Sequence, residues 1–196
     1  MNSNTDAAGS LLDIGCGNGR ILEASIGWNS VGVEPVASFA ANASQYGKVY
    51  SSLIEVTETF EAISIMAVLE HVLDPFIILK QAFALAVPGA LLIVEVPNGH
   101  RPDASILDLA LRISGRPWTV RTAPLQTPFH LAEFSKKSLT LAAQNAGWKV
   151  ERMWTIRGNI DYPIPGPLNL VFNLIQRLSS PFGWGLNLIM LARKPA

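Results

Sequence analysis

The chain has 196 residues, which is enough for one domain with a substantial core. Lys plus Arg and Asp plus Glu both total 15, so the formal net charge of zero lacks the basic excess that nucleic-acid-binding proteins usually show. The single cysteine excludes an intramolecular disulfide and a multi-cysteine zinc site, and it suits a reducing compartment. We therefore expect a cytoplasmic protein with no bound metal, no secretory signal and no membrane-spanning segment.

Short apolar runs alternate with helical patterns along the chain, in the order that is typical of βαβ units. Strands are predicted over residues 11–14, 30–33, 48–51, 62–66, 90–96, 148–156 and 186–192. Helices are predicted over residues 20–26, 37–45, 75–86 and 135–145, the last with Ser135 as its N-cap. This order predicts an α/β fold with a doubly wound, seven-stranded sheet. The sheet is mostly parallel, and we expect the last strand to run antiparallel between the fifth and the sixth.

Two stretches interrupt this rhythm. Residues 99–134 are rich in proline around one amphipathic segment, 104–113, and an insertion of this length is typical of a lid or a binding loop. A proline-rich turn at 161–167 precedes a very apolar helical segment at 168–178, which could rest on a membrane surface or on a second copy of the chain. We interpret residues 1–196 as a single domain with a lid-like insertion at about 99–134 and a C-terminal helix–strand extension at about 159–196.

The strongest local motif is a glycine-rich turn, L-L-D-I-G-C-G-N-G-R, directly after the first predicted strand. Glycines at such a turn let a ligand approach the backbone closely, and the amides that open the next helix favour a negatively charged group. Glu34 closes the second predicted strand, where a carboxylate can accept hydrogen bonds from both hydroxyls of a ribose. The turn and the acid together predict a nucleoside-containing ligand.

The details of the turn disfavour a dinucleotide. The G-x-G-x-x-G fingerprint would place its third glycine at position 20, where this chain has Arg20. Asp13, just before the first glycine, would repel phosphates but would attract an amino group. The site therefore suits a ligand with a ribose, an ammonium and a carboxylate. A nucleotide-dependent oxidoreductase stays open as a weaker alternative.

At this point the sequence resembles the class I S-adenosylmethionine-dependent methyltransferases. D-I-G-C-G-N-G at 13–19 is similar to their first motif, and V-G-V-E-P at 31–35 is similar to their second. Residues 60–75, 87–98 and 130–148 resemble later segments of the branch that includes the ubiquinone-biosynthesis O-methyltransferases. The resemblance implies a Rossmann-like fold, S-adenosylmethionine as the cofactor and methyl transfer to a small-molecule acceptor.

The resemblance also implies which residues bind the cofactor. Many relatives hold the adenine amino group with an acid after the third strand, but Ser51 and Ser52 stand there in this chain, so their hydroxyls or backbone would have to substitute. Cys16 is interpreted as a small filler rather than a nucleophile. The implied cofactor-binding residues are Asp13, Gly15, Cys16, Gly17, Gly19, Glu34, Pro35, Ser51, Ser52, Met66, Ala67 and Leu69.

Two histidines are candidates for catalysis. His130 lies at the end of the predicted lid, where it could take a proton from an acceptor hydroxyl, and His71 follows Glu70 in the fourth-strand motif. The Glu70–His71 pair could equally serve only to fix the local geometry. We favour O-methylation of a small apolar acceptor, and a non-catalytic cofactor-binding regulatory module stays open as an alternative.

Overall fold

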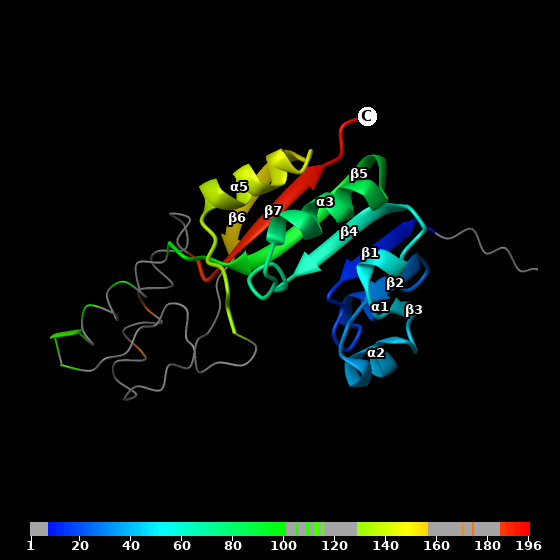
Figure 1. Ribbon diagram of the computed structural model, residues 1–196, viewed down its shortest axis with the longest axis horizontal. Helices are drawn as coiled ribbons and strands as arrows, with labels where there is room; N and C mark the ends of the chain where they lie inside the picture. The colour runs from blue at the N-terminus through cyan, green and yellow to red at the C-terminus, as the bar shows by residue number, and fades with distance from the viewer. Residues whose placement is uncertain are drawn as a thin grey trace, which may run out of the picture.

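A computed structural model describes residues 8–100, 129–156 and 185–196, together with the single positions 105, 109, 112, 113, 115, 170 and 174. Its centre is a seven-stranded sheet in the order β3-β2-β1-β4-β5-β7-β6 (Figure 1). The strands are β1 (Ser10–Ile14), β2 (Asn29–Val33), β3 (Lys48–Tyr50), β4 (Phe60–Met66), β5 (Ala86–Pro97), β6 (Lys149–Ile156) and β7 (Asn187–Arg193). Neighbours from β3 to β5 are parallel, and β7 runs antiparallel to both β5 and β6. The predicted sheet is confirmed, including the place of its last strand.

Helices and loops connect the strands. The described helices are α1 (Arg20–Ala24), α2 (Ala37–Ala43), the 3-10 turn η1 (Leu53–Glu55), α3 (Pro75–Leu85) and α5 (Lys136–Asn145). Asp74 accepts hydrogen bonds from the first free amides of α3, and Ser135 forms a capping box with Ser138 at the start of α5. In Figure 1, α3 and α5 lie next to each other over the β4–β7 part of the sheet. The predicted N-cap at Ser135 is confirmed.

The central strands bury large apolar side chains on one face of the sheet, because the register places these side chains on the same side. Fully buried side chains from the neighbouring strands include Leu12, Ile63, Ile65, Leu92 and Met190. The register pairs Ile14 with Val33 on one side and with Ile65 on the other. The carboxyl ends of β1, β2 and β4 therefore lie side by side, and the loops that follow these strands meet at one edge of the sheet.

The model differs from the predicted elements in detail. Strand β5 begins at Ala86 rather than at residue 90, because the Pro88–Gly89 pair forms an irregularity inside the strand and not a turn before it. Gly89 adopts a φ of 82° there, and its amide donates to the carbonyl of Lys194 beyond the end of β7. This hydrogen bond to the C-terminal segment pairs residues before position 90, so β5 begins earlier than its apolar stretch. The η1 turn was not predicted, because three residues carry no periodic signal.

Several predictions fall on residues that the structure does not describe. The lid-like insertion is described at its two ends and at a few single positions, and most of 104–113 lies outside the described residues. The same holds for the turn at 161–167 and most of the segment at 168–178. In the part of the chain that is described, no helix is both long and apolar enough to cross a membrane.

Candidate functional site

The glycine turn after β1 uses each of its three glycines differently. All three have positive φ angles, of 76°, 52° and 84°. A Cβ on Gly15 would lie 2.3 Å from Val68 Cγ2, and one on Gly19 would lie 2.8 Å from the backbone of Ala43 in α2. A Cβ on Gly17 would meet no atom within 4 Å. Gly15 and Gly19 therefore allow close packing, whereas Gly17 keeps an open space that a ligand can approach.

Glu34 connects the end of β2 to this turn. Its Oε2 accepts a hydrogen bond of 3.0 Å from the Gly17 amide, and its Oε1 accepts one of 2.8 Å from the Val36 amide. The residue is only 7% exposed. The carboxylate is thus fixed beside the open space at Gly17, in the position expected of a ribose-binding acid. Pro35, next to it, is exposed.

Asp13 lies in β1, two residues before the first glycine of the turn. It is 2% exposed, and its Oδ1 accepts a hydrogen bond of 2.7 Å from Ser64 Oγ on β4. Burial raises the pKa of Asp13 to about 6, although the bond from Ser64 acts in the lowering direction. A buried carboxylate of this kind gains from a nearby positive charge, so the predicted contact with a ligand amino group is physically reasonable. It stays a prediction.

Cys16 fills space beside β2. Its Sγ would lie 2.6 Å from a Cβ on Gly32, so the thiol occupies room that a glycine leaves free. Burial, followed by the charges of Asp13 and Glu34, raises the pKa of the thiol to about 12. The thiol is therefore not activated as a nucleophile, in agreement with the interpretation of Cys16 as a filler.

The loop after β3 holds an acid that sequence reasoning missed. Ser51 Oγ donates a hydrogen bond of 2.7 Å to Glu55 Oε1, while Ser52 Oγ accepts from the Ile54 amide at 3.4 Å and caps η1. The η1 turn thus brings Glu55 back to Ser51, so an acid lies next to the position where the family resemblance implies one. The spacing of Ser51 and Glu55, four residues apart on a turn, was the only signal in the sequence.

The loop after β4 supplies the next predicted residues. Met66 is partly buried, and Ala67 is exposed with a φ of 55°, which is unusual for a residue other than glycine. The Ala67 amide donates to the carbonyl of Glu95 on β5, so this conformation is held from the neighbouring strand. Leu69 is completely buried, and its side chain belongs to the core. Any contact of Leu69 with a cofactor would therefore have to involve its backbone.

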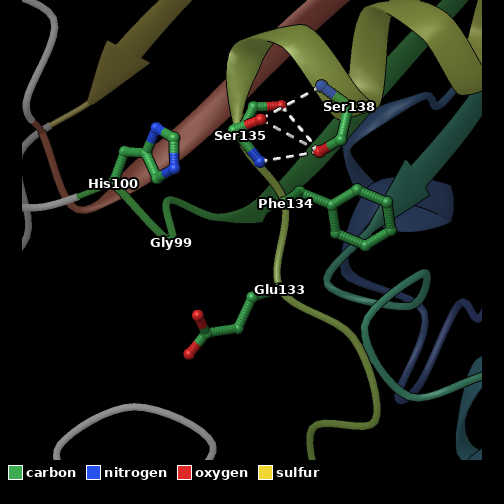
Figure 2. A pocket seen from close by; sticks show the side chains of 6 residues that line it. All are labelled: Gly99, His100, Glu133, Phe134, Ser135 and Ser138. Atoms are coloured by element: carbon green, nitrogen blue, oxygen red, sulfur yellow. Dashed lines mark hydrogen bonds between the residues drawn. The ribbon is translucent and has the colours of Figure 1, made fainter.

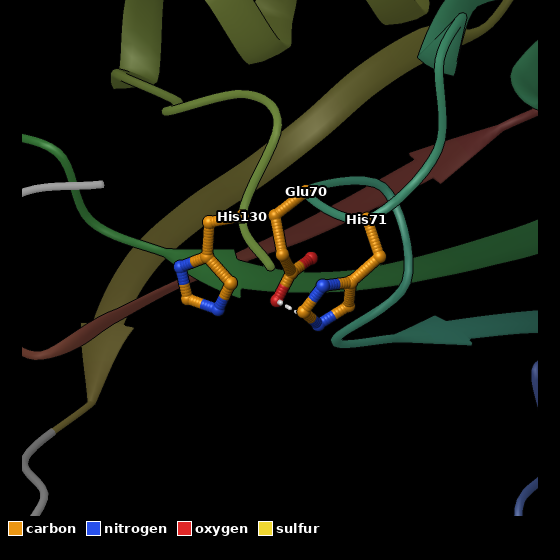
Figure 3. Close-up of side chains that lie close together, drawn as sticks. All are labelled: Glu70, His71 and His130. Atoms are coloured by element: carbon orange, nitrogen blue, oxygen red, sulfur yellow. Dashed lines mark ion pairs between the residues drawn. The ribbon is translucent and has the colours of Figure 1, made fainter. Parts of the chain in front are cut away.

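The two candidate catalytic histidines meet beside this loop, although they are far apart in the sequence. The ring centroids of His71 and His130 are 4.9 Å apart, with an angle of 62° between the planes. His71 Nε2 lies 3.9 Å from Glu70 Oε1, and Figure 3 shows the Glu70 carboxylate close to the two rings. Glu70 is 1% exposed, and its Oε2 has no hydrogen-bond partner among the described residues.

The electrostatics of this cluster favour neutral side chains. Burial raises the pKa of Glu70, a charge on His71 lowers it, and Glu95 raises it again. Burial and then a positive charge on His71 lower the pKa of His130, while Glu133 raises it. An imidazole with a lowered pKa is unprotonated at neutral pH and can accept a proton.

Among the described residues, Glu70, His71 and His130 are also the set whose spacing would allow them to surround a small cation. Each offers one ligand atom, and these atoms all lie within 4.8 Å of one another. No metal is expected from the sequence, and no local pattern in it indicates that a buried carboxylate joins the two histidines. The same three side chains could also accept a hydrogen bond from a donor group of a substrate.

A separate hollow lies at the start of α5. Gly99, His100, Glu133, Phe134, Ser135 and Ser138 line a cavity of about 160 Å³ (Figure 2). Its wall contains the capping box of α5 and none of the predicted cofactor residues. The hollow is thus distinct from the glycine turn.

Solved structures of known proteins share this fold. An S-adenosylmethionine-dependent methyltransferase from Archaeoglobus fulgidus matches with a TM-score of 0.64 at 19% identity, over 94% of this chain and 86% of that one. One from Methanosarcina mazei matches with a TM-score of 0.64 at 16% identity, over 97% of this chain and 94% of that one. The sheet order and the glycine turn therefore define the Rossmann-like class I methyltransferase architecture.

The family follows from the sequence comparisons. The model of a methyltransferase-domain family matches residues 2–152, so the chain belongs to that family. A ubiquinone biosynthesis O-methyltransferase from Cereibacter sphaeroides is 33% identical over 130 residues, which are 60% of this chain and 51% of the relative. The chain spans about half the length of these curated relatives. The resemblance to the S-adenosylmethionine-dependent methyltransferases is confirmed.

Proposed function

We propose that this chain binds S-adenosylmethionine at the glycine turn and transfers its methyl group to a hydroxyl of a small, apolar acceptor. The observation that carries the proposal is the open space at Gly17, which Glu34 borders and Asp13 underlies. The Asp13 carboxylate disfavours a phosphate-rich dinucleotide, whereas Glu34 and Asp13 together match the ribose and the ammonium of S-adenosylmethionine.

The chain's own residues would hold this cofactor in distinct ways. Glu34 would accept hydrogen bonds from the ribose, and the backbone at Gly17 would approach the amino-acid part. Asp13 would balance the positive charge of the ammonium. Met66 and Ala67 would border the adenine side, with Ser51 and Glu55 beyond them. When bound, S-adenosylmethionine supplies a methyl group that its positively charged sulfur already activates.

The residues beyond β4 would then act on the acceptor. Because the donor is activated, orientation of the acceptor carries much of the rate. A hydroxyl acceptor also has to lose a proton, and His130, neutral at physiological pH, would accept it. Burial raises the pKa of Glu70, which lies next to the two histidines. This arrangement supports O-methylation.

The acceptor class is inferred from the side chains next to His130. The side chains of Phe129 and Leu131 on either side of His130 are apolar and more than half exposed, so they would border an apolar acceptor. The similarity to ubiquinone biosynthesis O-methyltransferases agrees with a hydroxylated ring that carries a hydrocarbon chain. We further propose a cytoplasmic location and no nucleic-acid partner. We also propose that the apolar segment at 168–178 rests on a membrane surface or on a second copy of the chain.

The experiment that tests the proposal is a transfer assay with S-adenosylmethionine labelled in its methyl group. The panel contains alkyl- and prenyl-substituted phenols and catechols, and each is paired with its fully O-methylated counterpart as a control. We expect label in the extracted product only where a free hydroxyl is present. Cofactor binding without transfer to any acceptor would instead identify a regulatory module.

A further inference from the structure

The position of His130 depends on polar contacts rather than on burial. The side chains of Phe129 and Leu131 are 52% and 55% exposed, so neither anchors the segment in the core. The nearest large buried side chain after His130 belongs to Phe134, which is 5% exposed, and its carbonyl accepts from the Gly99 amide. Residues 129–131 therefore need another attachment to stay in one place.

The turn after β4 provides that attachment on both sides of His130. The Glu70 carbonyl accepts hydrogen bonds from the amides of Leu131, at 2.6 Å, and Ala132, at 3.2 Å. The imidazole of His71 lies 2.8 Å, through Nδ1, from the Phe129 carbonyl. A carbonyl can only accept, so Nδ1 carries the hydrogen and donates it. His130 thus lies between a side-chain hydrogen bond to the residue before it and two backbone hydrogen bonds from the residues after it.

The remaining atoms of His71 point to the same role. With Nδ1 committed to Phe129, only Nε2 could exchange a proton, and Nε2 lies 3.9 Å from Glu70 Oε1, beyond hydrogen-bond length. The ring instead meets the ring of His130 edge to face, at 4.9 Å between centroids (Figure 3). His71 therefore restricts both the backbone before His130 and the orientation of the His130 ring.

We infer that His71 is a positioning residue: its Nδ1–H holds the Phe129 carbonyl and its ring supports the His130 imidazole, so that His130 faces the acceptor. The inference rests on the proposed function, in which His130 accepts the proton. It separates the roles of two histidines that the sequence analysis placed together as catalytic candidates. His71 itself touches neither the acceptor nor the cofactor in this account.

Two substitutions separate the nitrogens of His71. The amide nitrogen of His71→Asn takes a position close to Nδ1 and can still donate to the Phe129 carbonyl, whereas His71→Gln places its amide nearer to the position of Nε2. His71→Ala removes both, and His100→Ala is the matched control, because His100 is exposed and lies outside the cluster. With a phenol that the transfer assay identifies as an acceptor, kcat and KM are measured for all four variants.

We expect His100→Ala to keep kcat within about threefold of the natural chain. His71→Asn should lose no more than about fivefold, because it keeps a donor to the Phe129 carbonyl but loses the ring contact with His130. His71→Gln and His71→Ala should lose roughly tenfold or more, with the KM for S-adenosylmethionine unchanged. The inference would be overturned if kcat fell equally in all three His71 variants, or if kcat were higher in His71→Gln than in His71→Asn. Either result would show that the contact made by Nδ1 is not what turnover requires. Full activity in His71→Ala would overturn it as well.

A second readout needs no acceptor. Hydrogen exchange of the Leu131 and Ala132 amides should accelerate in His71→Gln and His71→Ala but not in His71→Asn. If His130→Ala keeps full turnover, the proposed base fails, while these exchange rates still test whether His71 holds the segment. If zinc or magnesium shifts the ring signals of His71 and His130 together and raises turnover, the cluster binds a metal and the positioning role is wrong.

Discussion

The glycine turn and the segment at 129–134 border the same edge of the sheet, but they are built in different ways. The turn directly follows a buried strand. Its shape is fixed by three glycines with positive φ angles and by the hydrogen bond from the Gly17 amide to the Glu34 carboxylate. The 129–134 segment reaches the site from a distant part of the chain. Three hydrogen bonds to Glu70 and His71 hold its exposed first half.

This difference has a functional meaning. A common cofactor needs the same rigid binding surface in every relative, whereas each acceptor needs a different one. A segment that few polar contacts hold can change its sequence without disturbing the core. We therefore expect substitutions at the turn to reduce stability and cofactor binding together, and substitutions at 129–131 to affect turnover alone.

The largest expected effect is that of Gly15→Ala. The new Cβ would lie 2.3 Å from Val68 Cγ2, at a φ of 76° that alanine rarely adopts. We expect the free energy of unfolding to fall by about 3 kcal/mol or more, with loss of S-adenosylhomocysteine binding. Urea denaturation and calorimetry measure the two effects.

Gly17→Ala is the matched control for that change. Its Cβ meets open space, so only the backbone conformation is strained, at a cost of about 1–2 kcal/mol. Cofactor binding should nevertheless weaken at least tenfold, because the methyl group occupies the approach to the backbone. Equal losses of stability in the two variants would contradict the separate roles assigned to Gly15 and Gly17.

His130→Ala tests the other region. Turnover should fall by about a hundredfold or more, while affinity for S-adenosylhomocysteine stays the same, because His130 is proposed to act on the acceptor alone. Kinetics with an acceptor and calorimetry on the same preparation provide the comparison. A parallel loss of cofactor affinity would mean that the two regions are not independent.

The contrast between the regions also explains what the sequence could predict. The turn was predictable residue by residue, because Asp13, Gly15 and Glu34 lie on or beside strong strand signals. The contact between His71 and His130 joins positions that no local pattern connects, and the buried carboxylate of Glu70 becomes visible only in three dimensions. Glu55 was missed because a 3-10 turn, which has no sequence period, carries it.

Asp13→Asn should stabilise the protein without ligand. The folded-state pKa of about 6 lies above the ordinary value of 3.8, so the stability contributed by this group is complete below about pH 3.8 and is lost as the pH rises through 6. At pH 8 the variant should be more stable than the natural chain by about 1–3 kcal/mol, and the difference should shrink towards pH 4. Urea denaturation at both pH values measures it.

Ser64→Ala should change stability in the direction opposite to Asp13→Asn, so it serves as a control for that variant. It removes the hydrogen bond that favours the charged carboxylate, so at pH 8 it should destabilise the protein. A stability difference for Asp13→Asn that is the same at both pH values would contradict the burial argument. Asp13→Asn should also weaken cofactor binding, because it removes the charge that would face the ammonium.

The smallest expected effect is at the adenine side. Glu55→Gln should weaken S-adenosylhomocysteine binding by about 1 kcal/mol or less, because Glu55 is exposed and solvent competes for its hydrogen bonds. Ser51→Ala should have a similar effect, since Ser51 orients Glu55. If Glu55→Gln weakened binding more than Glu34→Ala does, the placement of Glu34 at the ribose and Glu55 at the adenine side would be wrong.

Calorimetry of Glu34→Ala tests the central claim most directly. The matched control is Glu61→Ala, because Glu61 Oε2 also accepts from a backbone amide, that of Ser10 at 2.9 Å, but lies at the opposite end of β1. The natural chain and Glu61→Ala should bind S-adenosylhomocysteine alike and should not bind NAD. Glu34→Ala should bind at least about a hundredfold more weakly, because charge-assisted hydrogen bonds contribute roughly 1.5–3 kcal/mol each. Unchanged binding in Glu34→Ala, or tighter binding of NAD by the natural chain, would contradict the account.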